Sequence, residues 1–212
     1  ICGSHGGIHT GTDGSSAQSI EDLGIYRTIP GMTVMHPADD LSAEELTVQL
    51  LDYSSPSYMR TARNKTPRIY NENTVKNLQI GKGSKIRDGG DVCIIACGVM
   101  VNEAISAAQK LSSEGIEALV VDMHTIKPLD TELIERCVSD CGCLVTAEDH
   151  SIIGGLGGAV AEYLSTNATA PLEMVGVVDK FGQSGSTMDL MRTMGMTADD
   201  IVSAAHRSIS RK

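Results

Sequence analysis

The second half of the chain alternates apolar runs of strand length with segments of helical pattern. Turn and capping residues such as Gly115, Asp130 and Thr197 mark the helix ends. Strands that are apolar on both faces are typical of a parallel sheet covered by helices on each side. The pattern predicts an α/β fold, with a three-layer α/β/α domain and a mostly parallel sheet over residues 80–212. Its expected strands are Val92–Cys97, Ala118–Asp122, Cys143–Ala147 and Glu173–Val178, and its expected helices are Asn102–Glu114, Asp130–Ser139, Leu156–Leu164, Thr187–Met194 and Ala198–Ser208.

Residues 1–75 form a separate α/β unit in this interpretation, and residues 64–88 read as a polar linker with a domain boundary near residue 80. Short strands are expected at Ile1–Ser4, Met32–Met35 and Ser57–Thr61. Helices are expected from Ala17 to Ile29, and from a Ser42-x-x-Glu45 capping box to Tyr53. The chain opens directly in an apolar strand and without Met, so we expect this unit to lack its N-terminal half.

Charge and composition limit the function classes. The chain carries 17 basic and 27 acidic residues, a net charge of −10, and no Trp. Nucleic-acid binding usually needs a basic surface or an aromatic stacking platform, so neither a DNA nor an RNA partner is expected. No apolar run approaches the roughly 20 residues of a membrane span, and no secretory signal is visible. We expect a cytoplasmic protein with no membrane partner.

Six cysteines raise the question of a metal site. Cys93 and Cys97 lie in an apolar run and are expected to be buried thiols. The sequence also places Cys137, Cys141 and Cys143 near His150, but this spacing does not match the paired-cysteine zinc motifs. No residue is therefore assigned to a metal.

A glycine-rich loop, His5–Ser16, is the segment richest in chemistry. It follows a strand and precedes a helix, where open α/β sheets bind ligands. Its imidazoles, His5 and His9, suit phosphate binding or proton transfer, and Asp13 can accept hydrogen bonds from a hydroxyl. The loop matches neither the dinucleotide fingerprint nor the P-loop. The alternative is a plain Asp13-Gly14 turn with exposed histidines.

Three further sets of residues each allow two interpretations. Arg60 and Arg63 follow a strand in the same unit, and could bind phosphate or belong to a solvated basic loop. The Glu148–His150 segment could be an acid–base group or an interface loop. The glycines of 154–158 precede a helix, where they favour close packing over phosphate binding.

Three segments, in this order, resemble transketolases. HGGIHTGTDGSSAQSIEDLGIYRTIPGMTVMHPADD is similar to the segment that ends the pyrimidine-binding domain of that family. YMRTARNKTP resembles the last strand and arginine loop of the same domain, and AEDHSIIGGLGGAVAEYL resembles the transketolase C-terminal domain. The resemblance implies the C-terminal part of a pyrimidine-binding domain over 1–75, followed by the C-terminal domain over 80–212.

The resemblance implies an enzyme that transfers a two-carbon ketol unit between sugar phosphates, with thiamine diphosphate and Mg as cofactors. His5 matches the family histidine that holds the sugar phosphate, and Asp13 the aspartate that contacts a substrate hydroxyl. Arg63 matches the phosphate-binding arginine, with Arg60 as a neighbouring candidate. The resemblance assigns these four residues to substrate binding, and none to catalysis or to the metal.

Two departures from the family pattern affect the expected activity. Ala17 stands where the family often has a histidine that faces substrate and cofactor. The glutamate that activates the cofactor pyrimidine lies upstream of the matched segment, and the diphosphate and metal site belongs to the family's N-terminal domain. We therefore expect a split enzyme with an N-terminal subunit or domain as partner, inactive as this isolated piece.

The resemblance further implies a homo-oligomer, such as a dimer, formed through the C-terminal domain, and a place in the pentose phosphate pathway. Two alternatives stay open at this point. One is a related thiamine enzyme, such as deoxyxylulose phosphate synthase or a 2-oxoacid dehydrogenase beta subunit. The other is a non-catalytic assembly module.

Overall fold

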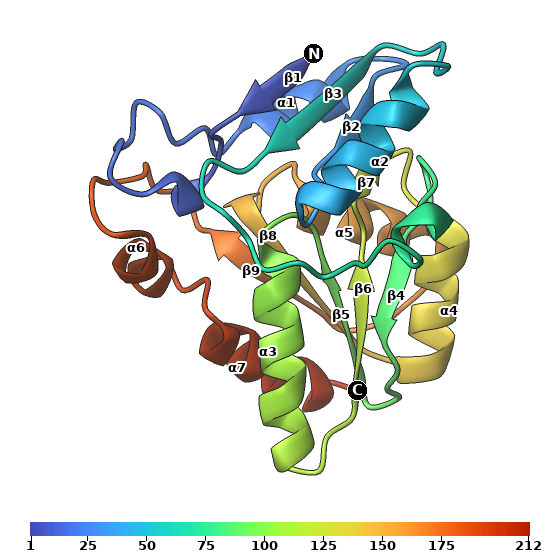
Figure 1. Ribbon diagram of the computed structural model, residues 1–212. Coiled ribbons are helices and arrows are strands. Elements are labelled where there is room, and N and C mark those ends of the chain that lie inside the picture. The colour runs from blue at the N-terminus through green and yellow to red at the C-terminus, as the bar shows by residue number, and fades with distance from the viewer.

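The computed structural model describes all residues from 1 to 212 and contains two sheets. In Figure 1 the smaller sheet lies at the top of the molecule, near the N-terminus, and the larger one below it. The smaller sheet has the strand order β1-β3-β2-β7, formed by Cys2–Ser4, Ser57–Thr61, Thr33–Met35 and Thr125–Lys127. Helices α1 (Asp22–Thr28) and α2 (Asp40–Leu50) belong to this unit, together with the short 3-10 helix η1 (Ile8–Thr10).

The larger sheet confirms the predicted α/β class. Its strand order is β4-β6-β5-β8-β9, and all pairs except β4–β6 are parallel. Alternate residues of β5 point to opposite faces. Ile94 joins a core with α3 and α7, whereas Cys93 and Ile95 join a second core with α4 and α5. The strands are Ser84–Arg87, Ala118–Asp122, Val92–Ala96, Leu144–Ser151 and Leu172–Val177, and the helices α3 to α7 are Met100–Ser113, Thr131–Cys141, Leu156–Asn167, Thr187–Thr193 and Ala198–Ile209.

Helix boundaries follow local capping chemistry. Asp130 and Thr197 cap α4 and α7, as predicted. Helix α2 differs from the prediction because its N-cap is Asp39, whose carboxylate accepts the backbone N–H of Ser42 at 2.8 Å. The Asp39 carboxylate satisfies an orphan donor of a first turn that starts at Asp40, so the helix begins before Ser42.

Helix α1 is also shorter than the predicted Ala17–Ile29 segment. The backbone N–H groups of Ala17 and Gln18 both bond to the Gly14 carbonyl, and so form turns rather than a helix. The Gln18 side chain is buried and donates to the carbonyls of Gly11 and Gln183. These contacts hold residues 14–18 in the loop.

The segment expected to be a linker packs closely on the larger sheet. It contains η2 (Val75–Asn77) and strand β4, and Val75 and Leu78 enter the hydrophobic core. The Asp39 carboxylate accepts the N–H groups of Ile69 and Tyr70 at 2.7 and 2.9 Å. The linker is therefore fixed to both units by burial and by hydrogen bonds to a charged group.

Strand β7 joins the two units and was not predicted. It follows β6 after only two residues, yet it pairs antiparallel with β2, with Val34 opposite Lys127. The backbone continues this contact, because the N–H of His36 bonds to the carbonyl of His124 at 2.8 Å. No helix of the chain is both long and apolar enough to cross a membrane.

The carboxyl of Asp122 is expected to make stability depend on pH. Asp122 is fully buried at the end of β6, where it accepts a 2.6 Å hydrogen bond from Tyr70 through Oδ2, while Oδ1 has no partner. Burial raises its pKa to about 7, against the opposing effect of the Tyr70 hydrogen bond. Because the folded state holds this proton more tightly than the unfolded chain, the stability it contributes is present below about pH 4 and is lost as the pH rises through 7.

We expect Asp122→Asn, which mimics the protonated carboxyl, to remove that pH dependence. Urea unfolding of both proteins at intervals from pH 5 to pH 8 measures the effect. As the pH rises, the free energy of unfolding of the variant should increase relative to that of the parent chain. A difference that stays constant with pH would contradict the expectation.

Candidate substrate site

Two neighbouring strand ends bring the predicted site residues to one edge of the smaller sheet. Strands β1 and β3 are parallel, with Ser4 opposite Thr61. The pairing extends one residue further, because the N–H of His5 donates to the Thr61 carbonyl at 3.1 Å. The loop that starts at His5 and the loop that carries Arg63 therefore leave the sheet side by side.

His5 has an unusual backbone conformation for a residue with a side chain. Its φ is 70°, in the left-handed region. Such strain costs free energy and is concentrated at functional sites. The imidazole is exposed, its Nδ1 lies 2.7 Å from Ser4 Oγ, and its Nε2 has no partner in the protein. The ring therefore offers one free nitrogen to a ligand.

Asp13 and Arg63 meet across the two loops. Arg63 Nε lies 2.9 Å from Asp13 Oδ2, and each side chain is about one third exposed (37% and 33%). Beside this pair, Asn64 Nδ2 donates to the carbonyl of His9 at 2.7 Å. The ion pair uses Nε, and Nη1 makes one long contact of 3.5 Å to Asn64 Oδ1, so further N–H groups of the guanidinium can bind an anion such as phosphate.

Arg60 occupies a different environment from Arg63, and its predicted substrate contact needs correction. Its side chain has no exposed surface, because it projects inward from β3. The guanidinium pairs with Asp22 Oδ1 at 3.2 Å, and donates to the Asp149 carbonyl at 2.5 Å. A substrate cannot reach it in this structure, so Arg60 ties the two units together, and only His5, Asp13 and Arg63 remain candidates for substrate binding.

Two glycines of the loop allow its backbone to pass close to the buried side chains of Arg60 and Asp149. A Cβ on Gly6 would lie 2.6 Å from Arg60 Nε. A Cβ on Gly7, whose φ is 84°, would lie 2.0 Å from Arg60 Nη2 and 2.1 Å from Asp149 Oδ2. Any side chain at these positions would displace the loop or the ion pair.

The segment Glu148–His150 lies buried between the two units, which agrees with an interface role. Glu148 accepts the N–H groups of Leu156 and Gly157, at 2.7 and 2.8 Å, and so occupies the start of helix α5 with its own carboxylate. His150 Nε2 accepts the N–H of Gly24 from helix α1 at 3.2 Å. Glu148 therefore fixes α5 to β8 within the larger unit, whereas His150 contacts the smaller unit.

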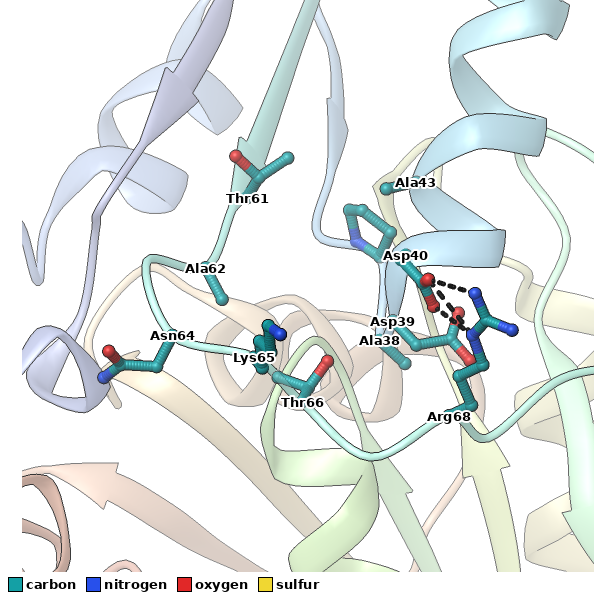
Figure 2. A pocket seen from close by; sticks show the side chains of 11 residues that line it. Ala38, Asp39, Asp40, Ala43, Thr61, Ala62, Asn64, Lys65, Thr66 and Arg68 are labelled. Atoms are coloured by element: carbon teal, nitrogen blue, oxygen red, sulfur yellow. Dashed lines mark hydrogen bonds and ion pairs between the residues drawn. The ribbon is translucent and has the colours of Figure 1, made fainter.

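A cavity of about 520 Å³ lies on the other side of the segment that carries Arg63. Figure 2 shows its lining, with Asp40 and Arg68 joined by a two-pronged ion pair. Thr61, Asn64, Lys65 and Thr66 contribute its polar side, but His5, Asp13 and Arg63 do not line it. The strained histidine and the interloop ion pair therefore form an open surface that is separate from this cavity.

Two family models match the chain. The transketolase pyrimidine-binding domain matches residues 1–68, and the transketolase C-terminal domain matches residues 81–201. The chain therefore belongs to the transketolase family.

Several of its relatives are subunits or C-terminal sections. The chain is 45% identical to the 6-deoxy-6-sulfo-D-fructose transketolase subunit of a Clostridium species, with 100% of this chain and 65% of that protein covered. It is 41% identical to a putative transketolase C-terminal section of Methanocaldococcus jannaschii, over 95% of this chain and 63% of that protein. It thus spans just under two thirds of the length of these relatives.

A solved structure described as a split-gene transketolase, inactive beta4 tetramer, has the same fold. The TM-score is 0.92 at 38% identity, and the match covers 99% of this chain and 66% of that chain. A transketolase from Pichia stipitis matches with a TM-score of 0.79 at 21% identity, over 98% of this chain and 29% of that chain, which supports the fold alone.

The residues of this chain do not form a complete site for the cofactor of the family, thiamine diphosphate. The buried carboxylates near the loop are already paired: Asp22 with Tyr58 and Arg60, and Asp149 with two backbone N–H groups. None is free to contact the pyrimidine ring. No group of three His, Cys, Asp or Glu side chains is arranged to hold a metal ion, and all six cysteines are free thiols.

Proposed function

We propose that this chain supplies the sugar-binding edge of a transketolase that moves a two-carbon ketol unit between sugar phosphates. The observation that carries the proposal is the Asp13–Arg63 ion pair beside the strained, exposed His5, at the shared end of β1 and β3. A cation, an imidazole and a carboxylate at one edge match a ligand with an anionic end and hydroxyl groups.

Each of the three side chains has a distinct role in the proposed site. Arg63 binds the terminal phosphate through its free N–H groups. His5 adds a hydrogen bond through Nε2, which has no partner in the protein. Asp13 holds the guanidinium in place and accepts a hydrogen bond from a sugar hydroxyl.

The names of two relatives support an anionic sugar as substrate. One is a 6-deoxy-6-sulfo-D-fructose transketolase subunit, and the other belongs to the apulose-4-phosphate transketolase of Phocaeicola vulgatus and is 36% identical to this chain. A sulfonate and a phosphate are both oxyanions that an arginine and a histidine can bind. Within this class we favour phosphorylated sugars of the pentose phosphate pathway in the cytoplasm.

The proposed enzyme also needs a cofactor and a second subunit. Thiamine diphosphate, when bound, supplies the carbanion that carries the ketol unit, while the protein orients the sugar. We propose that an N-terminal transketolase subunit holds the cofactor and Mg, a proposal supported by relatives that are described as a transketolase subunit and a split-gene transketolase. The C-terminal domain then supports a homo-oligomer of the assembled enzyme.

A related thiamine enzyme is the second candidate. 1-Deoxy-D-xylulose-5-phosphate synthases of Heliobacterium modesticaldum and Geobacter sulfurreducens are 34% and 32% identical to this chain. Transfer of a ketol unit from a ketose donor would support a transketolase, whereas formation of 1-deoxyxylulose 5-phosphate would support such a synthase. A non-catalytic assembly module would show neither reaction.

Replacing His5 should weaken binding of phosphorylated donors selectively. We expect His5→Ala to raise the KM for a phosphorylated ketose by roughly tenfold, the usual effect of losing one hydrogen bond to a charged group. The KM for the same sugar without phosphate should change less than twofold. His206→Ala, at a half-exposed histidine of helix α7, is the control. An equal change for both sugars would contradict this role for His5.

A further inference from the structure

The Asp149 carboxylate holds the substrate loop from the other domain. Asp149 lies in β8 of the larger sheet, and its side chain is 1% exposed. Its Oδ1 accepts the N–H of Ile8 at 2.7 Å, and its Oδ2 accepts the N–H of His9 at 3.1 Å. Two successive backbone N–H groups that point at one anion form a compact anion-binding turn.

The buried arginine fixes this carboxylate in turn. Arg60 Nη2 lies 2.5 Å from the Asp149 carbonyl oxygen and 3.6 Å from its Oδ2. Gly7 passes so close to both groups that it leaves no room for a side chain. These contacts fix the position of the Asp149 carboxylate, and its hydrogen bonds fix the position of the backbone at Ile8 and His9.

The anchored turn lies between the substrate-binding residues of the same loop. Thr10 Oγ1 donates to the carbonyl of His5 at 2.5 Å, which fixes the start of the loop to the turn. The His9 carbonyl accepts from Asn64, the residue after Arg63. Thr10 therefore connects the Asp149 turn to His5, and Asn64 connects it to the loop that carries Arg63.

We propose that Asp149 is a positioning residue that orders the substrate loop before the sugar binds. This deepens the proposed function and rests on it for its kinetic consequence. Holding a loop in its bound conformation improves affinity because the ordering entropy is not lost on binding. The C-terminal domain, to which the sequence assigns no substrate contact, then acts on substrate affinity through the Asp149 carboxylate.

Amide hydrogen exchange on the full-length protein with its partner subunit tests the anchor without any activity. Asp149→Asn keeps the size of the side chain but removes the charge and one acceptor. We expect protection of the Ile8 and His9 amides to fall by roughly 10- to 100-fold. Asp130→Asn is the matched control, because Asp130 is another buried carboxylate of the same domain that accepts two N–H groups, from Leu133 and Gly83. Protection within twofold of the parent protein in Asp149→Asn would overturn the proposal.

Kinetics of the same variants separate positioning from simple stabilisation. Asp149→Asn should raise the KM for the phosphorylated donor by about tenfold with a smaller change in kcat, whereas Asp130→Asn should change neither. An unchanged KM in Asp149→Asn would overturn the positioning role. If the parent complex shows no ketol transfer, the proposed function fails, and the exchange experiment still decides whether Asp149 anchors the loop.

A second pair of variants applies if Asp149→Asn does not fold. Gly7→Ala would force the loop away from the carboxylate, whereas Gly31→Ala has a similar φ of 71° but meets nothing within 4 Å. We expect lower protection of Ile8 and His9 in Gly7→Ala only. Equal protection in the two variants would overturn the proposal.

Discussion

Arg60→Met lowers the free energy of unfolding by about 3–5 kcal/mol in our account, because it leaves two buried carboxylates without a cation. Asp22 and Asp149 both contact the guanidinium, and the arginine has no exposed surface. Methionine fills much of the volume, so the loss comes from charge rather than from a cavity. Urea unfolding measures it directly.

Arg68→Met is the matched control for this prediction. Arg68 also forms a two-pronged ion pair, with Asp40, but these side chains are 63% and 60% exposed. Ion pairs between exposed side chains contribute little to stability, so we expect a much smaller loss in Arg68→Met than in Arg60→Met. Equal losses in the two variants would show that Arg60 does not act as a buried tie between the units.

Arg63→Leu should produce the largest effect on substrate binding. Removing a charge-assisted contact to a phosphate costs roughly 1.5–3 kcal/mol, so we expect KM for phosphorylated sugars to rise about 10- to 150-fold. Stability should change little, because Arg63 and Asp13 are both partly exposed. Initial rates at varied donor concentration test this with the complete enzyme.

Lys65→Leu provides the comparison within the same loop. Lys65 is exposed, carries the same charge, and lines the separate cavity of Figure 2. Its replacement should leave the KM within about twofold, since a solvated lysine away from the substrate contributes little. Similar effects at both positions would mean that the loop attracts substrate by general charge rather than through Arg63.

Much of the fold could be predicted because its signals are local. Continuous apolar strands indicated the larger sheet, and the caps Asp130 and Thr197 placed two helices correctly. Strand β7 escaped prediction because it has only three residues and pairs with β2, about 90 residues earlier. Strand β4 was also not predicted, because its four residues lie in a polar segment and pair with the distant strand β6. The boundary near residue 80 stays a prediction.

The candidate site was predictable only in part. Residue type and resemblance predicted His5, Asp13 and Arg63 as substrate-binding residues, and the structure pairs two of them. Arg60 and Arg63 are three residues apart and look alike in sequence, but only burial in β3 distinguishes them. Asp149 was grouped with an interface segment, because nothing local shows that its carboxylate meets a loop 140 residues away.

Ketol transfer from xylulose 5-phosphate to ribose 5-phosphate, with thiamine diphosphate and Mg, tests the central claim most directly. The assay compares this 212-residue chain, the complete product of its gene, and that product mixed with the candidate N-terminal subunit. We expect transfer only in the mixture. Robust turnover by the 212-residue chain alone, or no transfer in a mixture shown to form the complex, would contradict it.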